Sequence, residues 1–387
     1  MLPAAKQLAL SPTQVSLNEP VRSNRPSPGR LSKGLHLATW ALLALTLAAA
    51  PAVASSGDRQ PSFHLCSNLC EVSQCEPHSP PIPLILRLFG WSCLDNCNYH
   101  CAHRLTNEAD SGREQYHQFY GKWAFYRLGP IQEPLSVLAS LGNLYVHYRG
   151  LKRVRRTVRP DNNLRPWLEG LAYIQINTWL WSTVFHARDT PITERLDYFS
   201  AMITIAFTLL YAIVRIFGIV TPKTISPLVY PVSSAVAIFV LWHFFYVLSF
   251  PHFPYGYHVG VAIVIGMIHN VLWLIWTLSF YVELPTVSIN DTLLAWPEPY
   301  PPRNARASRR PAHATMPAIL VGLTMAAMTF EILDFAPIYR FLDSHALWHL
   351  ATIPLGEKWW EYMCADANEL DGGLLGPFSS RIDKNTD

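Results

Sequence analysis

Beyond residue 130, apolar residues gather into long segments that are separated by polar connections. A stretch of about 20 apolar residues can cross the hydrocarbon core of a bilayer as an α-helix. We therefore expect an all-α membrane protein, with a bundle of seven transmembrane helices at residues 131–362. The first and last segments are the weakest, because each carries polar residues. The seven segments are 131–149, 166–187, 196–218, 227–250, 257–282, 314–336 and 341–362.

The residues before this bundle predict a protein that enters the secretory pathway. Residues 1–33 are polar and rich in Ser, Pro and Arg, which is typical of a disordered leader. A basic stretch then precedes the apolar run 35–50, and the sequence Ala52-Val-Ala54 has the form of a cleavage site. We predict a signal peptide at 34–54, with an uncleaved signal anchor as the alternative. Either would place the next segment, 55–130, in the lumen.

Six of the seven cysteines lie within residues 55–130, which we call the Cys-rich segment. In an oxidising lumen, an even cluster of cysteines is typical of disulfides. We expect three disulfides, with the pairing left open; a zinc knuckle is the alternative. The segment should depend on its disulfides, because it has no long apolar run to build a core. The six residues are Cys66, Cys70, Cys75, Cys93, Cys97 and Cys101.

The distribution of charge predicts how the bundle is oriented. A chain with 50% hydrophobic and only 15% charged residues is too apolar for an ordinary soluble protein. Its formal charge of +3 is nearly balanced, so the position of the basic residues carries the information. Lys and Arg are concentrated after the first and fifth segments, the loop after the third contains Lys223, and such basic loops are usually cytosolic. Residues 363–387 would then form a cytosolic tail.

Several polar residues that are far apart in the sequence fall at one membrane depth in this topology. Ser182 and His186 end the second segment, Asp197 begins the third, and His345 and His349 begin the seventh, all on the lumenal side. Residues four apart share a helix face, so each pair can face one cavity. Three neutral imidazoles and one open position form the ligand set of a catalytic zinc ion, which lowers the pKa of a bound water to near neutrality.

The other polar residues can complete a hydrolytic site. We expect Asp197 to act as the general acid and base and Ser182 to donate a hydrogen bond to the oxyanion. The alternative role for Ser182 is that of a nucleophile with His186 as its base. Glu331 and Asp334, near the lumenal end of the sixth segment, either orient the histidines or are simple helix-end carboxylates. Ionisable groups within membrane segments are usually functional, although a histidine can also just bridge helices.

The pattern Ser182-x3-His186-x10-Asp197, followed by His345-x3-His349, resembles the CREST superfamily of seven-span membrane hydrolases. This superfamily includes alkaline ceramidases and adiponectin-type receptors. The cysteine block that ends at Trp91–Cys101, together with His345-Ala-Leu-Trp-His349, resembles its Per-one-like branch, the post-GPI-attachment lipid-remodelling factors. The resemblance covers about residues 60–365.

This resemblance implies a phospholipase A2-type enzyme that removes the sn-2 acyl chain from the lipid of GPI-anchored proteins. It assigns Zn²⁺ to His186, His345 and His349, the acid–base role to Asp197, and the oxyanion donor to Ser182. It also implies residence in the endoplasmic reticulum membrane, with the Golgi as the alternative, and a lumenal active site. GPI-anchored proteins and membrane lipids are the expected partners, and nucleic acid is not.

Two other functions stay open. One is a ceramidase-like lipid amidase that uses the same metal site. The other is a non-catalytic membrane chaperone or receptor for GPI-anchored proteins, in which zinc is a structural clamp and Asp197 closes its fourth position.

Overall fold

The computed structural model describes residues 55–76, 80–282, 287–289, 292–294 and 313–372, so the predicted leader, the predicted signal peptide and most of the predicted tail lie outside the described residues. Apart from one short hairpin, the elements in these ranges are helical, which confirms the predicted all-α class. The Cys-rich segment contains η1 (Gly57–Arg59), α2 (Pro61–Gln74), α3 (Leu84–Leu88) and α4 (Cys93–Asp110). The long helices are α5 (Pro134–Thr157), α6 (Arg165–Ala187), α7 (Pro191–Ile216), α8 (Val229–Leu248), α9 (Tyr255–Leu278), α10 (Met316–Leu333) and α11 (Ser344–Leu370); the hairpin is β1 (Val287–Ile289) and β2 (Thr292–Leu294).

Each of the seven predicted membrane segments coincides with one long helix. Among the described residues, four of these helices are long and apolar enough to cross a membrane: α7, α8, α9 and α10. They expose large apolar side chains such as Ile238, Phe245 and Ile332, as a lipid-facing surface requires. The crossing of α5, α6 and α11, which are more polar, stays a prediction.

The first long helix is longer than predicted at its C-terminal end. Basic residues that we expected in a loop after position 149 lie on the last turns of α5, which continues to Thr157. Arg153 donates a hydrogen bond of 2.6 Å to Glu357 of α11, and Arg155 lies 3.7 Å from Glu169 of α6. These ion pairs hold the polar end of α5 in helical form against its neighbours.

Two further helix boundaries differ from the prediction. The third segment begins at Pro191 and not at 196, because Pro191 occupies the first helical turn and Thr190 forms a capping box with Thr193. The seventh continues to Leu370 and not to 362. Asp366 in this extension accepts hydrogen bonds from the buried Arg215 of α7, and the pair is buried on both sides. The predicted tail therefore begins as helix.

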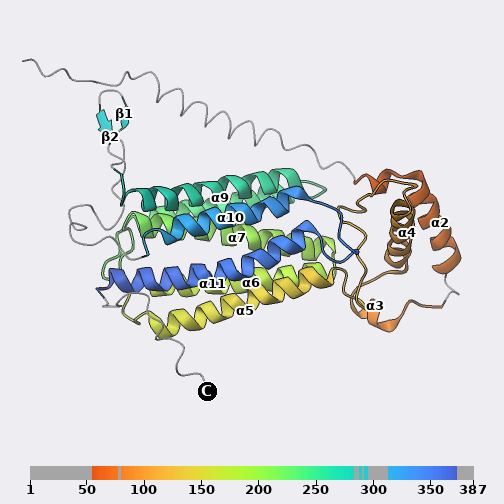
Figure 1. Cartoon of the computed structure of the whole chain (residues 1–387), viewed down its shortest axis with the longest axis horizontal. Helices are drawn as coiled ribbons and strands as arrows, with labels where there is room; N and C mark the ends of the chain where they lie inside the picture. Colours follow the sequence, from red (N-terminus) through yellow and green to blue (C-terminus); the bar gives the residue numbers. More distant parts are fainter. Residues whose placement is uncertain (1–54, 77–79, 283–286, 290–291, 295–312, 373–387) are drawn as a thin grey trace, which may run out of the picture. The chain divides into compact units, whose positions relative to one another are not determined.

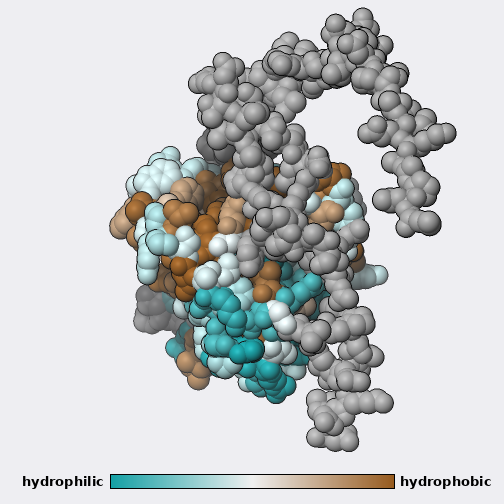
Figure 2. All heavy atoms as spheres, turned by 90° about the vertical axis from the view of Figure 1, so that its left-hand side faces the viewer, coloured by the Kyte–Doolittle hydropathy of each residue, from teal (hydrophilic) through white to brown (hydrophobic). Residues whose placement is uncertain are grey.

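The long helices pack side by side in one bundle (Figure 1). Helix α5 packs against α6 and α11, α7 packs against α6, α8 and α9, and α10 packs against α9 and α11. The core between them is rich in tryptophan, with Trp273, Trp276 and Trp360 fully buried. Figure 2 looks onto the end of the bundle at which α11 ends; its lower part, toward α5, is hydrophilic and its upper part, toward α9, is hydrophobic.

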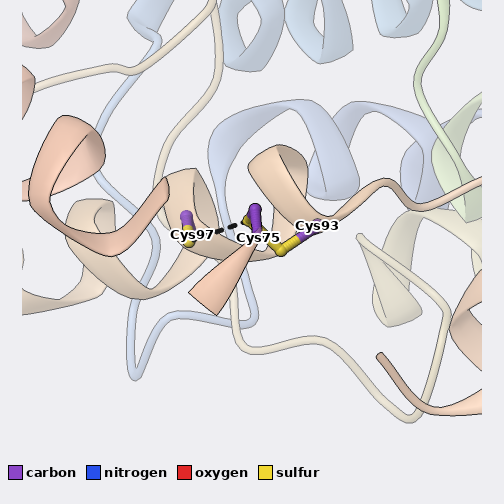
Figure 3. A group of neighbouring side chains, drawn as sticks. All are labelled: Cys75, Cys93 and Cys97. Atoms are coloured by element: carbon purple, nitrogen blue, oxygen red, sulfur yellow. Dashed lines mark hydrogen bonds between the residues drawn. A yellow bond between two sulfur atoms is a disulfide. The ribbon is translucent and has the colours of Figure 1, made fainter. Parts of the chain in front are cut away.

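The three predicted disulfides are present and link α2, or its C-cap residue Cys75, to α4. The cysteines repeat about once per helical turn in both segments, so two antiparallel helices can pair them in nested order. Figure 3 shows Cys75 bonded to Cys93, with Cys97 beside them. These three sulfurs lie close enough for a metal site, but each belongs to a disulfide, so the alternative of a zinc knuckle is wrong. The pairs are Cys66–Cys101, Cys70–Cys97 and Cys75–Cys93.

The Cys-rich segment also has a small core, which its sequence pattern did not predict. Phe63 of α2 packs against Phe119, with ring centroids 4.8 Å apart, and Leu105 of α4 joins them. The disulfide Cys66–Cys101 borders this cluster. Hydrophobic packing and disulfides therefore act together in this segment.

A buried arginine links the Cys-rich segment to the connection between α10 and α11. Arg340 donates a hydrogen bond of 3.0 Å to Nδ1 of His103 and one of 2.7 Å to Asn107, both on α4. Burial lowers the pKa of His103 to about 4, so its ring is neutral at physiological pH. The ring can then donate from Nε2 to the carbonyl oxygen of Phe125 at 2.9 Å and still accept from Arg340.

Helices α5 and α11 approach closely at Gly150, where a Cβ atom would lie 2.4 Å from the ring of Trp360. That ring cannot move easily, because it donates a hydrogen bond of 3.0 Å to Nδ1 of His147. We expect Gly150→Ala to lower the free energy of unfolding by about 1–3 kcal/mol, as overpacked cores do. Gly322→Ala on α10 is the matched control, since a Cβ atom there meets nothing within 4 Å. Thermal unfolding in detergent measures both; equal stability of the two variants would contradict the packing described here.

Candidate metal centre

Three histidines from two helices that are far apart in the sequence converge at one end of the bundle. His186 lies in the last turn of α6, and His345 and His349 lie in the first two turns of α11. One ligand nitrogen from each ring lies within 4.8 Å of the other two. The ring centroids are 5.1 Å apart for His186 and His345 and 4.4 Å apart for His345 and His349. The structure therefore brings together the three residues that the sequence grouped.

The hydrogen bonds of these rings fit a metal site. Nδ1 of His186 lies 2.7 Å from Glu133, and Nδ1 of His345 lies 2.6 Å from Glu331. A carboxylate accepts, so each of these Nδ1 atoms carries the proton, and in the neutral ring Nε2 then keeps a lone pair for a metal ion. Nε2 of His186 is buried and has no hydrogen-bond partner among the described residues. A buried polar atom without a partner is costly, and a metal ion would satisfy it.

The third histidine is held by a serine relay that includes a predicted site residue. Nδ1 of His349 lies 3.0 Å from the hydroxyl of Ser140 on α5, and that hydroxyl lies 3.0 Å from the hydroxyl of Ser182 on α6. Both serines are buried. Asn143, one turn further along α5, donates a hydrogen bond of 2.7 Å to the carbonyl oxygen of His349. Ser182 therefore lies beside the histidines.

The three predicted carboxylates occupy different positions. Asp197 is buried in the second turn of α7 but is not a member of the group of mutually close metal ligands. Glu331, in the last turn of α10, contacts His345 directly. Asp334 is the C-cap of α10 and accepts hydrogen bonds from Gln118 and Trp123. Of the two candidates for orienting the histidines, the geometry places Glu331 in that position and directs Asp334 to the Cys-rich segment.

The residues of α5 and its N-cap that complete this centre were not predicted from the sequence. Glu133 is the N-cap of α5, and its backbone N–H also donates to the carbonyl oxygen of His186 at 3.0 Å. Ser136, Ser140 and Asn143 follow on one face, at helical spacing, and all are buried. Polar residues at this spacing in an otherwise apolar segment were a usable signal, because a membrane helix places such residues inward.

A lysine from the Cys-rich segment lies next to Glu133. Lys122 forms an ion pair with the carboxylate of Glu133 and lies 3.4 Å from Asp189. Burial alone would lower the pKa of Lys122, but the two carboxylates outweigh this effect and raise it above its usual value. The Lys122 side chain is therefore positively charged at the edge of the centre.

The different placement of Glu331 and Asp334 gives a matched test. We expect Glu331→Ala to weaken zinc binding by about 10–100-fold, the usual effect of losing a carboxylate that orients a metal-bound histidine. Asp334→Asn should bind zinc like the wild type, because Asn tolerates the left-handed φ of 37° and keeps an acceptor for Gln118. Chelator competition on purified protein measures both affinities. Equal affinity of the two variants would show that Glu331 does not orient a ligand.

Comparison with known proteins gives a consistent set of relatives. The chain is 31% identical to a mouse (Mus musculus) protein named GPI-specific phospholipase A2-like PGAP3, over 85% of this chain and 94% of the relative. It is 34% identical to the protein PER1 homolog of Schizosaccharomyces pombe, over 78% of this chain and 84% of the relative. It is 33% identical to post-GPI attachment to proteins factor 3 of Drosophila melanogaster, over 80% of this chain and 88% of the relative.

No solved structure gives a significant match to the chain. Residues 83–367 match the Per1-like family, and this range includes α4, all the long helices except the last residues of α11, and the three histidines. The chain therefore belongs to the Per1-like family.

Proposed function

We propose that this protein is a zinc-dependent hydrolase that removes the sn-2 acyl chain from the lipid of GPI-anchored proteins. The observation that carries the proposal is the convergence of three histidine rings, two of which have Nδ1 held by a carboxylate. The names of the mouse and fly relatives support the substrate, since they refer to a GPI-specific phospholipase A2-like protein and to a post-GPI attachment factor. Both matches cover most of each protein.

The residues around the histidines provide the groups that ester hydrolysis needs. Bound to His186, His345 and His349, zinc would supply an activated water for attack on the acyl carbonyl. Asp197 is buried, interacts electrostatically with His345 and is outside the close ligand group. Its carboxylate would take a proton from the attacking water and return it to the leaving alcohol. Ser182, held by Ser140, donates to the carbonyl oxygen as negative charge develops there.

The position of the centre suits a lipid substrate. It lies where α6 and α10 end and α7 and α11 begin, and the connection between α10 and α11 contacts α4 of the disulfide-linked pair. Disulfides belong to an oxidising lumen, and the basic last turns of α5 lie at the other end of the bundle. We propose that all seven long helices cross the membrane and that the site faces the lumen of the endoplasmic reticulum, or alternatively of the Golgi.

One observation weighs against the non-catalytic alternative. A structural zinc site has four protein ligands, whereas a catalytic site keeps one position open. Asp197 was the residue expected to close the site, and it is not in the close group of ligands. The close group among the described residues thus has three ligands and not four. A lipid-product assay separates ester from amide hydrolysis, since the former releases a fatty acid from a phospholipid and the latter from a ceramide.

The direct test replaces one ligand in cells. We expect His186→Ala to reduce GPI lipid remodelling by about 100-fold or more, because a catalytic metal contributes several kcal/mol and each 1.4 kcal/mol corresponds to about tenfold in rate. Mass spectrometry of GPI-anchored proteins should then find the original sn-2 chain retained. His64→Ala, on the exposed face of α2, is the control for expression and should remodel normally. Normal remodelling by His186→Ala at wild-type protein levels would refute the hydrolase proposal.

A further inference from the structure

Lys122 reaches the candidate metal centre from the Cys-rich segment. It follows a tight turn in which Tyr120 and Gly121 have φ values of 52° and 79°, and its backbone pairs with that of Phe119 in both directions. Phe119 is part of the small core of the segment, next to Phe63. The turn therefore fixes Lys122 to the part of the chain that the disulfides hold.

The Lys122 ammonium group contacts side chains that belong to the helix bundle and its connections. It forms ion pairs with Glu133 and with Asp189, which precedes α7, and it lies 3.9 Å from the ring centroid of Phe185 on α6. The Lys122 side chain is 16% exposed and that of Glu133 is 4% exposed. Such burial makes the pair sensitive to substitution, because removing one partner of a buried ion pair leaves the other charge uncompensated.

Glu133 divides its two oxygens between two partners. Oε1 accepts from Lys122, and Oε2 accepts from Nδ1 of His186 at 2.7 Å. The backbone N–H of Glu133 also bonds to the carbonyl oxygen of His186. With one oxygen fixed by Lys122, the other has a fixed position relative to the imidazole. A continuous chain of contacts thus runs from the disulfide-linked core through Lys122 and Glu133 to His186.

We propose that Lys122 is a positioning residue of the metal centre and that the Cys-rich segment thereby completes the active site. Lys122 fixes the Glu133 carboxylate, and Glu133 orients His186 so that Nε2 faces the metal. The proposal rests on the proposed zinc function and adds a role for the Cys-rich segment. It differs from a role in folding alone, because it requires Lys122 to act on metal binding through Glu133.

A double-mutant cycle on the purified full-length protein in detergent tests this route. The variants are Lys122→Met, which keeps the apolar stem without the charge, Glu133→Gln, and the two combined. The measured quantity is zinc affinity by chelator competition, with thermal unfolding recorded in parallel. We expect Lys122→Met and Glu133→Gln each to weaken zinc binding by about tenfold or more. The double variant should bind zinc as Glu133→Gln does, since residues that act through one group are not additive.

Two further variants complete the design. Lys122→Arg should restore most of the zinc affinity, because it keeps a cation for Glu133. Lys358→Met on α11 is the matched control; this exposed lysine pairs with Glu361, and its loss should leave zinc affinity unchanged.

The outcomes separate this inference from the proposed function. If the wild-type protein binds no zinc, the proposed function fails, and the inference fails with it. If the wild type binds zinc and Lys122→Met binds it equally well, or if the losses of the two single variants add in the double variant, the role of Lys122 is wrong while the hydrolase proposal stands. A Lys122→Met variant that only unfolds at a lower temperature, with unchanged zinc affinity, would also contradict the inference.

Discussion

The candidate site depends on the contacts that the buried carboxylate of Glu133 makes. Glu133 is the N-cap of α5, and its carboxylate accepts from the ring of His186 and pairs with Lys122 of the Cys-rich segment. Its backbone N–H donates to the carbonyl oxygen of His186. A carboxylate is buried at this depth only if its charge is matched, and here the partners come from two parts of the chain. The same carboxylate therefore joins the Cys-rich segment to the bundle and sets the direction of one histidine.

The helix bundle separates two kinds of surface. Helices α8, α9 and α10 are apolar and expose residues such as Phe245 and Met267, which suits contact with lipid chains. Helix α5 instead buries Ser136, Ser140 and Asn143. Ser140 contacts α6 and α11, and Asn143 contacts α11. Close packing at Gly150 and Trp360 fixes the relative position of α5 and α11. Polar contacts at the site can therefore be held to fixed distances.

Much of the fold follows from local patterns in the sequence. The apolar segments predicted seven long helices, and the even cluster of cysteines behind the expected export signal predicted three disulfides. Helix ends were less predictable. Asp366 extends α11 through a partner, Arg215, that is distant in the sequence, and the last turns of α5 depend on Glu357 in the same way. Such tertiary contacts override local hydropathy.

The candidate site, too, was predictable where local sequence patterns define it but not where it depends on tertiary contacts. His186, His345 and His349 were predictable because their spacing and shared membrane depth are visible in the sequence. Glu331 and Asp334 looked equivalent, since both are acidic and three residues apart, but only the structure shows that they face different partners. Lys122 was not predictable at all: it lies outside the bundle in sequence, and nothing local indicates that its turn places it beside Glu133.

X-ray absorption at the zinc edge on the purified, metal-loaded protein tests the three-histidine zinc centre most directly. A centre built from His186, His345 and His349 should give one zinc per chain with three imidazole nitrogens and one oxygen at about 2.0–2.1 Å, and should lose one imidazole in His349→Ala. Sulfur in the coordination shell, or a zinc environment that does not change in His349→Ala, would place the metal elsewhere and contradict the account.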